Sequence, residues 1–119
     1  SSDLEESQLT KESEGDKELE DEKAKLLLYL QQGVVLGDYA EALHIPERKL
    51  SVFINSTYGV SFKRWVNNKR VEYATEQMAK HPDYTMERIA ELSGFAHKSH
   101  FCKIFREITG GSFTEYKNR

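Results

Sequence analysis

The sequence is poor in the features that build disulfide scaffolds, membrane spans and β-sheets. Its 119 residues include one cysteine and two prolines, and the longest apolar run is the five residues 26–30. A single cysteine cannot form an internal disulfide, so the chain does not require an oxidising compartment. A membrane-spanning helix needs about 20 apolar residues, and alternating β-branched runs bounded by hairpin turns are missing. These absences favour a soluble, all-helical protein, which we expect in the cytoplasm and out of contact with membranes.

The charge is divided between an acidic leader and a basic body. The net charge is −3, but residues 1–25 hold ten acidic residues against four lysines, whereas residues 26–119 hold ten against thirteen lysines and arginines. Residues 1–17 have too few apolar side chains to offset the entropy of ordering them, so we expect a disordered linker. The alternative is an autoinhibitory tail, whose acidic residues compete with a polyanionic partner for the basic body. The domain then spans 18–119, and because the chain begins with Ser1 instead of Met, we expect it to be part of a longer protein.

Glycines, prolines and capping residues divide the body into about seven predicted helices. Pro82 ends the longest amphipathic stretch, and Thr85 is placed to cap the helix that follows. The predicted spans are 18–31, 38–43, 47–57, 62–80, 86–93, 98–108 and 113–118.

An internal repeat is the most informative feature of the body. Residues 39–41 align with residues 89–91 at a separation of 50, and after one extra residue in the second copy the separation becomes 51. Each copy has a short helix, a tight turn and a longer helix, which is the pattern of a helix-turn-helix unit. The repeat predicts one unit at about 38–57, a second at about 86–108, and a linker helix at about 62–80. The later matched pairs are Leu50 with Phe101, Phe53 with Ile104, Ile54 with Phe105, Thr57 with Ile108, Gly59 with Gly110, Phe62 with Phe113 and Trp65 with Tyr116.

The second helix of each unit has one apolar stripe, which we expect to face the core. The stripes are Leu50, Phe53, Ile54 and Thr57 in the first unit, and Phe101, Ile104, Phe105 and Ile108 in the second. The opposite faces carry cationic, hydrogen-bonding and small side chains, with only Glu107 as an acid at a flank. Such side chains donate to phosphates and base edges, so these faces predict contact with double-stranded DNA. Trp65 has core-like neighbours and is predicted to pack inside rather than stack on a base.

The candidate DNA contacts follow from positions on these two helices. Side chains at a helix start reach base edges, which favours Arg48 and Lys98 for direct base contact. Val52 is suited to a thymine methyl group, and His97 lies at the entry to the second helix. We expect further base or sugar contacts from Ser51, Asn55, Ser99 and His100, and phosphate contacts from Lys49, Lys103 and Arg106.

The sequence resembles the DNA-binding domain of the AraC/XylS family of bacterial transcription regulators. The resemblance is strongest in IAELSGFAHKSHFCKIFREITGGSFTEYK, residues 89–117, and extends more loosely over YAEALHIPERKLSVFINSTYGVSFKRWV, residues 39–66, and RVEYA, residues 70–74. The family usually has proline where Phe113 stands and often arginine where Lys117 stands. The resemblance implies two helix-turn-helix units on one face of the duplex, no cofactor and no enzymatic activity. It also implies RNA polymerase as a further partner and a sensor or dimerisation domain upstream of this segment.

Two other classes of function are compatible with parts of the sequence. His97, His100 and Cys102 lie within six positions, as the ligands of a metal site or the groups of a small hydrolase would. Structural zinc needs four ligands, however, and on one helix His100 and Cys102 point about 160° apart. A helical module that binds another protein is the second class, and the sequence leaves it open.

Overall fold

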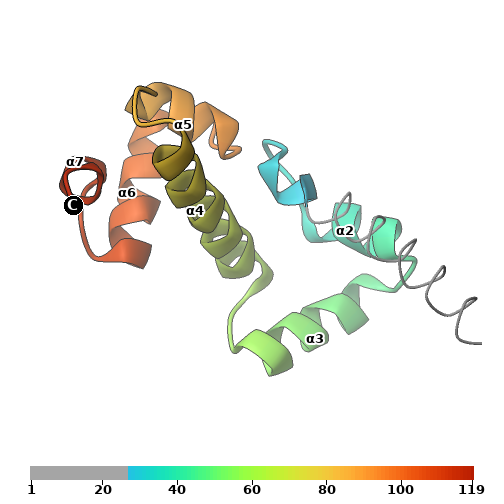
Figure 1. The fold of residues 1–119 in the computed structure, drawn as a ribbon. Helices are drawn as coiled ribbons and strands as arrows, with labels where there is room; N and C mark the ends of the chain where they lie inside the picture. The colour runs from blue at the N-terminus through green and yellow to red at the C-terminus, as the bar shows by residue number, and fades with distance from the viewer. Residues whose placement is uncertain (1–26) are drawn as a thin grey trace, which may run out of the picture.

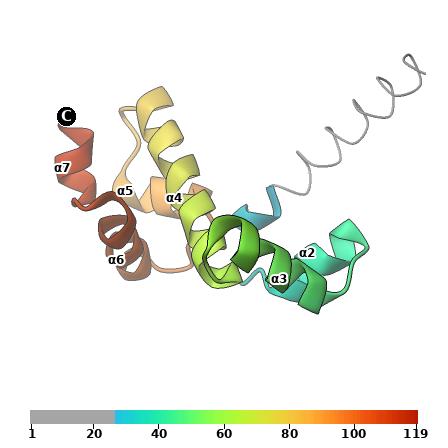
Figure 2. The same ribbon diagram turned by 90° about the horizontal axis from the view of Figure 1, so that it is seen from below.

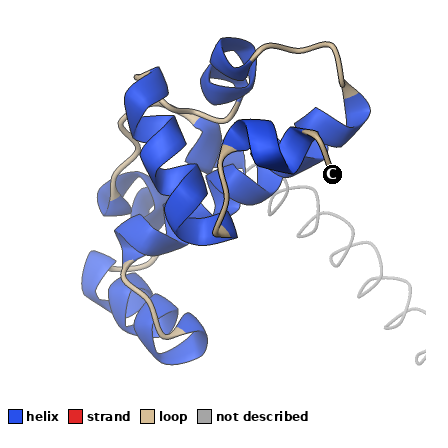
Figure 3. Cartoon of the chain, turned by 90° about the vertical axis from the view of Figure 1, so that its left-hand side faces the viewer, coloured by secondary structure: helices blue, strands red, loops and turns tan. Residues whose placement is uncertain are grey.

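The helices follow the predicted order closely. The computed structural model describes residues 27–119, and every regular element in this range is a helix (Figures 1 and 3). The all-helical class is therefore confirmed, with most boundaries within two residues of those predicted. The elements are the 3-10 helix η1 (Leu27–Leu30) and the α-helices α2 (Leu36–Leu43), α3 (Glu47–Tyr58), α4 (Phe62–Lys80), α5 (Met86–Leu92), α6 (Lys98–Thr109) and α7 (Phe113–Lys117).

Of the predicted helix at 18–31, the structure describes only the last residues, which form a 3-10 helix. Residues 18–26 and the expected leader at 1–17 lie outside the described range, while η1 is a single 3-10 turn that ends before Gly33. Gly33 has a φ of +74°, a left-handed value that turns the chain. Just before this turn, the carbonyls of Tyr29 and Gln31 accept hydrogen bonds from the side chain of Arg70 in α4.

The caps of the helices repeat as the sequence does. Ser61 accepts a hydrogen bond from the Arg64 N–H at 3.2 Å at the start of α4, and Ser112 accepts one from the Glu115 N–H at 3.2 Å at the start of α7. The helix before each of these serines ends at a left-handed glycine. These local signals stop and restart the chain at matching points, because a serine hydroxyl satisfies a free N–H group and glycine adopts positive φ without strain.

Two clusters of buried side chains form two cores, and α4 belongs to both. Phe62 and Trp65, near the start of α4, pack on the first core, whereas Val71 and Ala74 belong to the second. The first core consists of Tyr39, Ala40, Leu50 and Ile54, and the second adds Ile89, Ala90, Phe95, Phe101, Ile104, Phe105 and Phe113. Figure 1 shows α4 running between α3 at one end and the pair α5 and α6 at the other. We call α2 with α3 the first unit, and α5 with α6 the second.

Aromatic contacts confirm the core position of Trp65. Its ring meets that of Tyr39 at 5.3 Å and stacks on that of Phe62 at 6.2 Å. Phe113, where the family usually has proline, packs against Phe101 and Phe105 at 6.0 and 6.1 Å. The ring therefore fills part of the second core and anchors α7.

The predicted apolar stripe of the first unit is only half correct. Leu50 and Ile54 are buried, but Phe53 is 53% exposed and Thr57 is also exposed, whereas Ile104, the repeat partner of Phe53, is 7% exposed. In the second unit the long helix α4 precedes α5 and packs along α6. Before α2, by contrast, the described residues contain only the four-residue η1, so no long helix preceding the first unit covers Phe53. Phe53 instead rests its ring edge-on against Tyr58 at 6.3 Å.

The turn between α5 and α6 packs directly against η1. Gly94 has a φ of +88°, and a Cβ atom placed on it would lie 2.7 Å from the carbonyl oxygen of Leu30. Leu28 and Tyr29, in the same short turn, pack on the first core. This turn therefore contacts both units, and Gly94 is required for both its conformation and its size.

Replacing Gly94 with alanine should destabilise the domain more than the same change at Gly110. Both glycines have positive φ, where alanine costs about 1–2 kcal/mol, but open space surrounds Gly110 and the Leu30 backbone faces Gly94. Urea unfolding of Gly94→Ala and Gly110→Ala measures the difference. Equal free energies of unfolding for the two variants would contradict the close approach.

Candidate nucleic-acid interface

The second helices of the two units, α3 and α6, lie on the same side of the molecule, and we call them the reading helices. In Figure 2, α3 and α6 lie along the lower edge on either side of the start of α4, and α7 and the end of α4 lie toward the upper edge. Ten of the eleven candidate contacts are exposed, and Ser51 is half-buried. Those on or beside α3 are Arg48, Lys49, Ser51, Val52 and Asn55, and those on or beside α6 are His97, Lys98, Ser99, His100, Lys103 and Arg106.

The exposed face of α3 combines charge at its start with an apolar centre. Arg48 and Lys49 lie in its first turn, and Val52, one turn further on, is 59% exposed. Glu47 lies beside them, but its carboxylate is directed over the start of α2. A Cβ atom placed on Gly37 would be 2.5 Å from the Glu47 Oε1 atom. The Glu47 carboxylate therefore lies against the start of the neighbouring helix.

Lys98, at the start of α6, is engaged by an acid from the preceding helix. Its Nζ atom lies 2.9 Å from Glu87 Oε1 in α5. The hydrogen bond with Lys98 lowers the pKa of the Glu87 carboxyl, and the same bond raises the pKa of the lysine. Both side chains are exposed, so the pair contributes little to stability, but it sets where the lysine points. Sequence reasoning missed Glu87 because it considered the face of one helix at a time.

The cluster of His97, His100 and Cys102 is separated in space. His97 is the exposed N-cap residue of α6, and the His100 ring meets Phe95 edge-on at 5.6 Å. The Cys102 Sγ atom lies 3.3 Å from the sulfur of Met86. Within the described range, no three histidine, cysteine or acidic side chains are grouped to hold a metal ion.

Glu107 is the acid that the sequence placed at the flank of α6. Its carboxylate lies 3.9 Å from the Arg64 guanidinium at the start of α4, and both side chains are nearly half exposed. An exposed pair of this kind contributes little stability. It does place one acid of α6 beside a cation, which reduces its repulsion of a nearby polyanion.

Two helix-turn-helix units that share a long helix and present cationic second helices on one side define a class of DNA-binding domain. Residues 39–119 match the model of a helix-turn-helix domain family, and the chain belongs to this family, which is of the AraC type. The resemblance found in the sequence is thereby confirmed.

Two bacterial regulators are similar in sequence to the chain. The chain is 32% identical over 79 residues to the regulatory protein PocR of Salmonella typhimurium, covering 66% of this chain and 26% of PocR. It is 30% identical over 80 residues to the HTH-type transcriptional regulator YijO of Escherichia coli, covering 67% and 28%. The chain thus spans little more than a quarter of these relatives. No helix in the described range is long and apolar enough to cross a membrane.

Solved structures share the fold over most of the chain. The C-terminal domain of AraT, a response regulator from Geobacillus stearothermophilus, superposes with a TM-score of 0.69 at 25% identity, covering 82% of this chain and 83% of that one. The DNA-binding domain of AdpA, solved with a target DNA, has a TM-score of 0.69 at 21% identity, covering 84% and 88%. At this level of identity the second comparison establishes the fold alone.

Replacing Glu87 with glutamine should strengthen DNA binding. The change releases Lys98, a predicted base contact, and removes a carboxylate that repels the nearby DNA backbone, so affinity should rise and the slope of log affinity against log salt should steepen. Glu91→Gln is the matched control, because Glu91 is exposed on the same helix and has no ion pair among the described residues. A salt titration of both variants on one duplex measures the effect, and equal behaviour would contradict it.

Proposed function

We propose that the domain binds double-stranded DNA in a sequence-specific manner by inserting α3 and α6 into adjacent major-groove segments. The observation that carries the proposal is the presence of two helix-turn-helix units with exposed cationic second helices along one edge (Figure 2). Adjacent major-groove segments on one side of a duplex are about 34 Å apart, or one turn of about 10 base pairs. The expected target is therefore bipartite, with two half-elements about one helical turn apart. The duplex bends if the two helices lie closer together than straight DNA allows.

The side chains divide into two kinds of contact. Arg48, in the first turn of α3, has the five-donor guanidinium suited to a guanine edge. Lys103, one turn into α6, is a flexible point charge suited to a phosphate. The remaining predicted contacts keep the roles given above, and Glu87 sets the direction of Lys98.

The domain is then the output part of a bacterial transcription regulator. Its family membership and its relatives PocR and YijO, which are regulators by name, support this reading. We place its action on DNA in the bacterial cytoplasm. RNA polymerase as a partner, and a sensor or dimerisation domain elsewhere in the full protein, complete the proposal.

A module that binds another protein is the second candidate, and one observation favours it. Phe53 and Tyr58 are each 53% exposed and form an edge-to-face pair on α3. Exposed aromatic pairs are typical of protein interfaces. Binding to duplex DNA that weakens steeply as the salt concentration rises supports the first function. Absence of binding to any duplex at every salt concentration supports the second.

Substitution of Arg48 and Lys103 should separate base contact from phosphate contact. Arg48→Ala should cost about 1–3 kcal/mol and relax the preference at one base position. Lys103→Ala should weaken binding to all sequences alike and reduce the salt slope by about 1. Selection of bound duplexes from a random pool, followed by salt titrations, measures both. Loss of affinity in both variants without any change in base preference would contradict the assignment of these two contacts. Protection of only one short element in a DNA footprint would contradict the bipartite target.

A further inference from the structure

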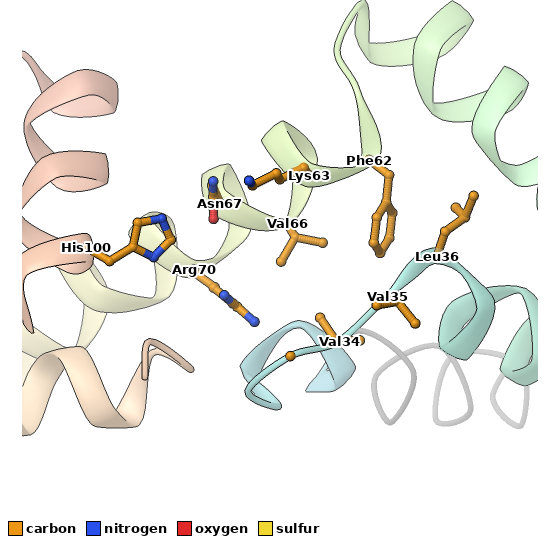
Figure 4. Close-up of a pocket in the computed structure, with 10 residues that line it drawn as sticks. Val34, Val35, Leu36, Phe62, Lys63, Val66, Asn67, Arg70 and His100 are labelled. Atoms are coloured by element: carbon orange, nitrogen blue, oxygen red, sulfur yellow. The ribbon is translucent and has the colours of Figure 1, made fainter. Parts of the chain in front are cut away.

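A cleft lies between the start of the first unit and α6, and it shares His100 with the predicted DNA-binding face of α6. Its volume is about 300 Å³, and it is bounded by the stretch before α2, the first half of α4 and one residue of α6 (Figure 4). Val34 and Leu36 line one side, and Phe62 and Val66 line the adjoining wall. The polar lining consists of Lys63, Asn67, Arg70 and His100, and no acidic residue lines the cleft.

Asn67 is the first sign that the cleft accepts a ligand. The residue is only 6% exposed, and its amide makes no hydrogen bond with the described residues. Its amide is nevertheless not among the fully buried polar atoms that lack a partner in the described residues, so it is open to solvent in the cleft. In Figure 4 the Asn67 amide lies between Lys63 and His100 at the cleft. Its NH₂ group is therefore available to an acceptor that enters.

The charges around Asn67 select an anion. Lys63 is exposed and has no ion pair among the described residues. The Arg70 guanidinium beside it is held by two backbone carbonyls, which have no formal charge to cancel its own. A site with an ammonium, an amide N–H donor, an imidazole and a fixed guanidinium, and with no carboxylate, suits a tetrahedral oxyanion such as phosphate.

The position of the cleft indicates where that phosphate comes from. One wall is the stretch that leads into α2 of the first unit, and His100 of α6 stands at the other side, so the cleft lies between the start of the first unit and the second reading helix. When neighbouring major-groove segments are occupied from one side, a strand of the DNA backbone passes between them. We propose that this cleft holds a phosphate of that strand, with the Lys63 ammonium and the Asn67 amide as donors and His100 at its edge. The inference rests on the function proposed above and adds a third contact region on the linker helix.

Two substitutions test the site on a duplex selected from a random pool by the unaltered chain. Lys63→Gln should lower affinity about three- to tenfold and reduce the salt slope by about 0.9, because one charge-assisted phosphate contact is lost. Asn67→Asp keeps the size of the side chain but directs a carboxylate at the phosphate, and should lower affinity at least tenfold. Lys80→Gln, at the exposed far end of the same helix, is the matched control and should bind as the unaltered chain does.

Neutral backbone analogues identify the partner of Lys63 directly. A single methylphosphonate, moved step by step through the segment between the two half-elements, removes one phosphate charge at a time. At one position the analogue should weaken DNA binding by the unaltered chain. At that position the unaltered chain and Lys63→Gln should bind with the same affinity. If the difference persists at every position, the cleft does not hold a DNA phosphate and the proposal is wrong. Because this comparison uses Lys63→Gln, it stands even if Asn67→Asp fails to fold.

The remaining outcomes separate the cleft from the proposed function. If Lys63→Gln and Asn67→Asp bind normally while Lys103→Ala is weakened, DNA binding stands and the cleft proposal falls. If the unaltered chain itself binds no duplex, the proposed function falls and the cleft proposal falls with it. Inorganic phosphate, titrated into the DNA-free chain while the Asn67 side-chain amide is followed by NMR, tests a small-molecule source. Saturation at or below millimolar phosphate would assign the cleft to a free anion and overturn the DNA assignment, whereas shifts only on addition of duplex support it.

Discussion

The buried guanidinium of Arg70 is the contact on which the arrangement of the two units depends. From the middle of α4 it donates to the Tyr29 carbonyl at 2.6 Å and to the Gln31 carbonyl at 2.9 Å, and it lies 5.4 Å from the centre of the Phe95 ring. Burial lowers the pKa of this guanidinium, but arginine remains charged in proteins. The charge is stabilised by carbonyl dipoles and an aromatic face, which suits a planar group with several donors. One side chain thereby joins the stretch before the first unit, the linker helix and the second unit.

This contact gives the DNA-binding surface a fixed geometry. The Leu30 backbone packs on Gly94 while Tyr29 packs on the first core, so η1 lies between the two units and Arg70 holds it there. Two reading helices that keep a constant separation engage both half-elements without paying the entropy of orienting the units on binding. The same junction forms the cleft that contains Asn67. Packing, geometry and binding are thus linked through the middle of α4.

The sequence was sufficient to predict the features that local chemistry sets. Serine caps, left-handed glycines and apolar periodicity gave the order and bounds of α2 to α7, and the repeat gave the two units. The sequence was insufficient where a contact with another helix decides whether a side chain is buried or paired. Phe53 fits a core stripe on a helical wheel, but within the described range no long helix precedes α2 to cover it. Glu87 reaches Lys98 across 11 positions, and the cleft joins residues of α4 to His100 of α6. Such contacts depend on the tertiary arrangement, which periodicity does not encode.

The most direct test of the role of Arg70 is the spacing between half-elements that the domain selects. Methionine at this position keeps a long apolar side chain but cannot donate to the two carbonyls. In a selection from duplexes with variable spacers, the unaltered chain should recover a single narrow spacing. Arg70→Met should recover the same half-elements over a broad range of spacings and with lower affinity. Recovery of one unchanged spacing with unchanged affinity would show that the orientation of the units does not depend on Arg70.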